Sequence, residues 1–161
     1  RKLMDQKTDG VEPLLLIAGD GAEEERIQQY AAAQLGRRAI LVGRLSRQDM
    51  RHYYSAADIF AFPGYEESLG MVYLEAQACR LPVVACEDWG AREAVLHGET
   101  GLLSPARDEQ VFVDHLEQLL SDDEFRQKMG RAAEQHVGLV HDIEYNYSRM
   151  LECLEKIAVK A

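Results

Sequence analysis

The sequence predicts an α/β fold, a Rossmann-like parallel sheet with helices on both faces, followed by a helical C-terminal tail. Three observations indicate this class. Short apolar runs alternate with longer stretches of helix-forming residues, the connections between them are short, and the pattern is helical from residue 108 onward. A length of 161 residues suits one hydrophobic core, so we treat residues 1–161 as a single domain.

Short apolar runs predict the strands. They are apolar on both faces, which is typical of parallel strands buried between helices. Glycine or proline follows the first three runs, where the chain would leave the sheet. The predicted strands are residues 14–18, 39–42, 58–62, 82–86 and 101–103.

Stretches rich in helix formers connect these strands. The first begins with three glutamates, which complement the helix dipole. The second begins at Ser46, an N-cap residue with an acidic side chain, Asp49, three positions later. The predicted helices are residues 23–35, 46–57, 70–79, 90–96, 109–120, 122–136 and 141–158.

Composition excludes several classes of function. With 18 Lys+Arg against 28 Asp+Glu, the net charge of −10 argues against a general nucleic-acid binder and against docking on anionic membranes. No apolar run approaches the roughly 20 residues that span a bilayer. Three cysteines without a C-x-x-C pair indicate a reduced, cytoplasmic protein and no metal site. The chain opens on Arg1-Lys2 and not on Met, and it shows no signal-peptide pattern, so we expect a piece of a longer polypeptide.

The turn after the first strand reads Gly19-Asp20-Gly21. It permits close approach of the backbone to a ligand, or it is simply a strand-to-helix turn that needs positive φ, which this short motif by itself favours. A dinucleotide fingerprint would need a third glycine where Glu24 stands. That disfavours a nicotinamide-dependent oxidoreductase.

Two glutamates in residues 63–76 are the most informative feature. Glu67 precedes a predicted helix and Glu75 lies within it, eight residues later, so both can point towards the strand ends. A carboxylate accepts hydrogen bonds from adjacent sugar hydroxyls, and amides at a helix start suit a diphosphate. The alternative is a helix-terminal charge at Glu67 and a solvated side chain at Glu75. Against it, the neighbours of Glu75 in the sequence are apolar, where an unpaired carboxylate is costly.

Four segments within residues 14–103 carry a family resemblance: LLLIAGDG, LVGRLSRQDMRHYYSAADIFAFPG, EESLGMVYLEAQACRLPVVA and GAREAVLHGETGLL. In this order and spacing they resemble the C-terminal, nucleotide-sugar-binding domain of group 1 (family 4) glycosyltransferases of the GT-B fold. The E-x7-E pattern of Glu67 and Glu75 is specific in this context. The resemblance implies the C-terminal half of a GT-B fold.

The resemblance also implies a role for each matched residue. Glu67 would be the catalytic residue, contacting the hydroxyls of the donor sugar, and Glu75 would bind the ribose. The remaining donor-binding residues would be Gly19 at the turn facing the nucleotide, Arg44 and Leu45 lining the base through their backbone, and Ser68, Leu69, Gly70 and Met71 offering amides to the sugar and diphosphate. The resemblance further implies that the transferred sugar keeps its anomeric configuration, that the leaving phosphate assists the transfer, and that the reaction needs no metal ion. No cofactor is implied beyond the donor itself, a UDP-, GDP- or ADP-sugar.

The chain departs from the family pattern in four ways. Arg80 stands where glycine is usual, and Trp89 replaces one glycine of a G-G pair; its indole either stacks on the sugar or base or packs within the loop. The Arg and Lys that would contact the diphosphate are absent, and so is the N-terminal acceptor-binding domain.

We therefore expect part of an enzyme of polysaccharide biosynthesis that transfers a hexosyl group to a glycan, lipid or small acceptor. The expected partners are the nucleotide sugar and the chain's own N-terminal domain, through which the enzyme would associate peripherally with a membrane. The fragment by itself would be inactive. The competing hypothesis is a non-catalytic nucleotide- or sugar-binding or regulatory module that kept the fold.

Overall fold

The computed structural model describes residues 12–64 and 68–158. The strands are β1 (Leu15–Ala18), β2 (Ala39–Gly43), β3 (Phe60–Phe62), β4 (Val83–Cys86) and β5 (Gly101–Ser104). The helices are α2 (Glu24–Gln34), the short 3-10 helix η1 (Gly36–Arg38), α3 (Arg47–Ala56), α4 (Met71–Ala78), α5 (Trp89–Ala94), α6 (Glu109–Ser121), α7 (Asp123–Val140) and α8 (Ile143–Ala158). Each predicted element is present, with ends that shift by a few residues.

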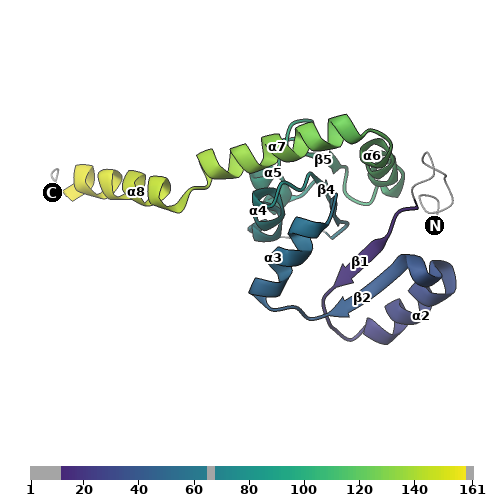
Figure 1. Cartoon of the computed structure of the whole chain (residues 1–161). Coiled ribbons are helices and arrows are strands. Elements are labelled where there is room, and N and C mark those ends of the chain that lie inside the picture. Colours follow the sequence, from purple (N-terminus) through teal and green to yellow (C-terminus); the bar gives the residue numbers. More distant parts are fainter. Residues whose placement is uncertain (1–11, 65–67, 159–161) are drawn as a thin grey trace.

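All strand pairs are parallel, as predicted, but they form two sheets, β1-β2 and β3-β4-β5. Figure 1 shows β1, β2 and α2 in the lower part of the view, the larger sheet above them, and α3 to the left of β1 and β2. No strand in the described residues pairs with the outer edge of β1. The apolar residues Leu14, Leu15 and Leu16 are 59%, 37% and 41% exposed.

The larger sheet holds the core, and helices cover both of its faces (Figure 1). Successive residues of β4 face opposite layers, as a strand requires. Val83 and Ala85 pack in a cluster with α4 and α5, while Val84 packs with Leu119 of α6 and Met129 of α7. Every residue of β4 and β5 is buried. This arrangement confirms the predicted α/β class.

The C-terminal end of α4 is a Schellman motif with arginine in the usual glycine position. The Arg80 N–H donates to the Gln77 carbonyl at 3.0 Å and the Leu81 N–H to the Ala76 carbonyl at 3.1 Å. Arg80 has φ +66°, in the left-handed region. Its Nε lies 2.6 Å from Oε2 of Glu134 on α7. The departure from the family pattern at Arg80 is thus a strained helix end tied to the neighbouring helix.

The last helix, α8, extends away from the rest of the domain (Figure 1) and has no buried residue. Its largest apolar side chains are more than half exposed at Ile143, Tyr147, Leu154 and Ile157. Their spacing of about three and a half residues places them along one face. None of the helices among the described residues combines the length and apolar character that crossing a bilayer requires.

Candidate functional site

The loops after β1 and β2 are joined by two contacts. The Gly19 N–H donates to the Gly43 carbonyl at 2.8 Å, and Nε of Arg44 lies 3.0 Å from Oδ1 of Asp20. Gly19 has φ +137°, so the turn does need the conformation that the sequence suggests for it. Leu45 is half-buried beside this pair. The structure thus brings Gly19, Arg44 and Leu45 to one end of the smaller sheet, where Gly19 and Arg44 are exposed.

A second group of predicted residues lies at the start of α4. Ser68 and Leu69 are exposed, and Gly70 caps the helix in a left-handed conformation with φ +68°. The first amides of a helix have no partner within the helix, and the helix dipole favours an anion in front of them. Residues 68–71 thus lie at the start of α4, and their contacts to the sugar and diphosphate stay a prediction.

Glu75 lies four residues after Met71 on the same helix, about one turn further along. Its side chain is half-buried rather than fully solvated, and it faces Tyr54 of α3. Burial, and after it the Glu75 carboxylate and the Cys79 thiol, together raise the pKa of Tyr54 to about 12. The Tyr54 hydroxyl therefore stays protonated. Glu75 itself has no ion pair among the described residues.

The residue expected to contact the donor sugar, Glu67, lies outside the described residues. Its catalytic role stays a prediction, as do the binding roles of the other site residues. The structure gathers the described ones into two groups, one at the ends of β1 and β2 and one at α4. Within the described ranges, no set of three or more His, Cys, Asp or Glu side chains is placed to hold a metal ion.

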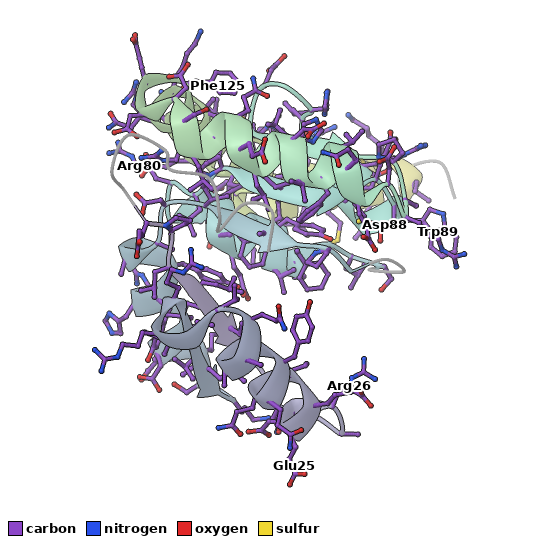
Figure 2. All side chains as sticks on the ribbon, turned by 90° about the vertical axis from the view of Figure 1, so that its right-hand side faces the viewer. Glu25, Arg26, Arg80, Asp88, Trp89 and Phe125 are labelled. Carbon is purple, nitrogen blue, oxygen red and sulfur yellow. The ribbon has the colours of Figure 1, made fainter. Side chains whose placement is uncertain are left out.

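Trp89 is the first residue of α5, after β4, and its indole does not pack within its loop. It is 77% exposed, while the next two residues, Gly90 and Ala91, are buried. The Asp88 carboxylate accepts a hydrogen bond from the Ala91 N–H at 3.1 Å and so caps the helix. Figure 2 shows Trp89 projecting outward beyond Asp88.

Sequence reasoning missed two features of the site. The first is Asp20, the partner of Arg44. The sequence does contain a signal for this pair, because an acidic residue follows the first predicted strand, a basic residue follows the second, and these two strands pair in the structure. The second is the contact between α4 and α5, where a Cβ on Gly70 would overlap the Gly90 carbonyl oxygen. Neither glycine spacing nor composition reveals that contact.

Parallel strands covered by helices define a class of α/β domain in which ligands bind beyond the carboxyl ends of the strands. The family model "Glycosyl transferases group 1" matches residues 2–136, and the chain belongs to this family. Its neighbours in sequence and structure are glycosyltransferases of the GT-B fold.

Three comparisons show how far the similarity reaches. D-inositol 3-phosphate glycosyltransferase of Corynebacterium diphtheriae is 42% identical over 110 residues, which are 68% of this chain and 25% of that protein. A GDP-mannose-dependent monoacylated alpha-(1-6)-phosphatidylinositol monomannoside mannosyltransferase of Corynebacterium glutamicum is 38% identical over 150 residues, 89% of this chain and 38% of that protein. The C-terminal domain of a group 1 family glycosyl transferase from Francisella tularensis superposes with a TM-score of 0.67 at 26% identity, covering 75% of this chain and 63% of that one. The chain thus spans less than half the length of the two Corynebacterium relatives.

Proposed function

We propose that this chain is the donor-binding, C-terminal domain of a retaining glycosyltransferase that transfers a hexosyl group from a UDP-, GDP- or ADP-sugar to a glycan, lipid or small acceptor. The observation that carries the proposal is the arrangement at α4. Amides of Ser68–Met71 stand at the start of the helix, and the half-buried Glu75 carboxylate follows one turn later. Amides at a helix start suit a diphosphate, and a carboxylate suits the two hydroxyls of a ribose.

The other predicted residues complete the donor site. The backbone around Gly19, Arg44 and Leu45 would line the base, and Glu67 would accept hydrogen bonds from hydroxyls of the hexosyl group. A relative whose name specifies GDP-mannose supports a GDP-sugar among the candidate donors. The donor itself would be the only small molecule required, with no cofactor.

The acceptor site would lie on an N-terminal domain of the parent enzyme. That domain would carry any peripheral association with a membrane, and the enzyme would work in the cytoplasm. Because the acceptor site and the cations that stabilise a departing diphosphate would be elsewhere, the 161-residue chain would bind donors weakly and transfer no sugar by itself.

A non-catalytic nucleotide- or sugar-binding module is the competing proposal. The departures from the family pattern at Arg80 and Trp89 favour it. Arg80 follows α4, the helix proposed to bind the donor, and Trp89 follows the strand β4. Such a module differs from the enzyme in one measurable respect: the parent polypeptide would bind a nucleotide sugar and release no nucleoside diphosphate in the presence of acceptors.

Calorimetric titration of the chain with UDP, GDP and ADP tests the donor site. We expect one nucleotide to bind, and Glu75→Ala to weaken it by about tenfold or more, because a hydrogen bond to a charged group is worth about 1.5–3 kcal/mol. Glu152→Ala, the same change on α8, should leave affinity unchanged. Binding of no nucleotide, or equal affinities for the two variants, would overturn the proposed site.

A further inference from the structure

We propose that Trp89 is a stacking platform for the hexosyl ring of the donor, and thereby a residue that selects sugar-bearing nucleotides over bare ones. The inference rests on the proposed function, since it needs a donor bound at α4. It goes further in assigning a contact to a side chain that replaces a glycine of the family pattern.

The first observation is the exposure of the indole. Trp89 is the only tryptophan among the 161 residues, and 77% of its surface faces solvent. Indole rings carry a large apolar surface and dominate the energetics of the contacts they enter. An exposed tryptophan that contributes nothing to the core is therefore available for a ligand.

The second observation is that the backbone beneath the indole is held firmly. Gly90 and Ala91 are buried, and the Ala91 side chain belongs to the main core cluster. The Asp88 carboxylate caps the helix through the Ala91 N–H, and the Asp88 carbonyl accepts from the Arg92 N–H at 2.9 Å. Trp89 thus projects from a fixed position, so a ring that stacks on it costs little ordering of the chain.

The third observation is the position of Trp89 relative to the donor segment. Gly70 lies so close to the Gly90 carbonyl that a Cβ would overlap it, so the starts of α4 and α5 are in contact. Leu69 and Met71, on either side of Gly70, are 72% and 52% exposed. Leu69 and Met71 thus place exposed apolar surface at the start of α4, and Trp89 does so at the adjoining start of α5.

The chemistry of this junction fits a pyranose ring. Such a ring has an apolar face of C–H groups and a rim of hydroxyls, so it needs a flat apolar surface next to polar groups. Trp89 supplies the first, while the amides of Ser68–Met71 supply the second. A sugar bonded to a diphosphate at the start of α4 would lie next to the start of α5, which carries the indole, and this favours the donor's hexosyl group over a separate ligand.

Matched titrations test the platform. We would measure how tightly the chain binds UDP and UDP-glucose, and GDP and GDP-mannose. The proteins compared are the wild type, Trp89→Ala, Trp89→Phe and Leu139→Ala. The last is the control, because the Leu139 side chain on α7 is also exposed, by 75%. We expect the sugar-bearing nucleotide to bind more tightly than its bare form. Trp89→Ala should reduce that ratio about fivefold, Trp89→Phe should retain most of it, and Leu139→Ala should leave it unchanged. Because Trp89 is the sole tryptophan, acrylamide should quench its fluorescence less with the nucleotide sugar than with the bare nucleotide.

The alternatives give distinct results. An unchanged ratio in Trp89→Ala overturns the platform while leaving the donor site intact. Equal weakening of both ligands in Trp89→Ala assigns the indole to the nucleotide or to the fold and overturns the inference. Free glucose and mannose are titrated as well. If Trp89→Ala abolishes their binding, the indole belongs to an acceptor-sugar site, which also overturns the inference. So does a change in sedimentation, which would place a second copy of the chain on Trp89. Absence of binding to any nucleotide overturns the proposed function itself.

Discussion

Nε of Arg44 lies 3.0 Å from Oδ1 of Asp20, which ties the loop after β2 to the loop after β1. The two side chains are 80% and 47% exposed, so the pair adds little to the stability of the fold. Its consequence is positional. It orients the backbone on either side of Arg44, and that backbone together with Gly19 forms the part of the site proposed to line the base.

Breaking this pair should weaken nucleotide binding more than it weakens the fold. We expect Asp20→Asn and Arg44→Gln each to change the free energy of unfolding by less than about 1 kcal/mol. Each should raise the dissociation constant of the bound nucleotide about threefold, equivalent to about 0.6 kcal/mol. In a double-mutant cycle the combined variant should lose little beyond either single variant. Fully additive losses would show that the two side chains act independently.

Gly130 and Gly138 offer a matched comparison on α7. A Cβ on Gly130 would overlap the Arg80 carbonyl oxygen, whereas a Cβ on Gly138 would meet nothing within 4 Å. Gly130→Ala should therefore lower the free energy of unfolding by about 1–3 kcal/mol, because α4 and α7 must move apart. Gly138→Ala should raise it by about 0.5–1 kcal/mol through helix propensity. Urea titrations of both variants measure the difference, and equal effects would contradict the close packing of α4 against α7.

Arg80→Gly should stabilise the chain. An L-residue in the left-handed conformation costs about 1–2 kcal/mol, which glycine avoids, while the exposed pair with Glu134 contributes at most about 1 kcal/mol. Glycine also gains freedom in the unfolded state, which reduces the benefit. We expect a net gain of about 0.5 kcal/mol by denaturant titration. Arg80→Lys retains the backbone strain and should give no gain; equal stability of these two variants would show that strain is not the cause.

Local signals predicted those parts of the fold that depend on neighbours in the sequence. Ser46 caps α3, with its Oγ accepting from the Asp49 N–H at 3.1 Å, as the pattern indicates. The apolar run at β4 is buried throughout. Both outcomes follow from residues within one turn of helix or one strand.

Other features depend on residues far apart in the sequence. The run at residues 14–18 looks as apolar as β4, yet much of it is exposed, because burial depends on elements packed against the faces of a strand, and among the described residues β1 contacts chiefly β2. The division into two sheets has the same origin. In the site, the Asp20–Arg44 pair and the contact of Gly70 with Gly90 join residues about 20 positions apart, and no local pattern encodes them.

The pairing of His97 with His115 makes stability depend on pH. His97 Nδ1 accepts a hydrogen bond from the Leu103 N–H at 2.9 Å, so this nitrogen carries no proton, and the two imidazole rings lie 5.8 Å apart. Nδ1 of His115 is buried without a hydrogen-bond partner among the described residues. Burial lowers the pKa of His115, the neighbouring His97 lowers it further, and Asp114 opposes the shift.

A lowered pKa means that the unfolded chain takes up a proton before the folded chain does. Below a pH of about 6.5, the ordinary pKa of histidine, the unfolded state therefore binds more protons than the folded state. As the pH falls through this range, the free energy of unfolding decreases until the folded state also takes up the proton. The free energy of unfolding, measured by urea titration, should decrease from pH 7.5 to 5. His115→Gln should reduce the slope, whereas His52→Gln, on the exposed face of α3, should leave it unchanged. The pKa of His136 is also lowered, chiefly by burial, so a variant that also carries His136→Gln should flatten the profile further. An undiminished slope in that double variant would assign the pH dependence to carboxylates instead.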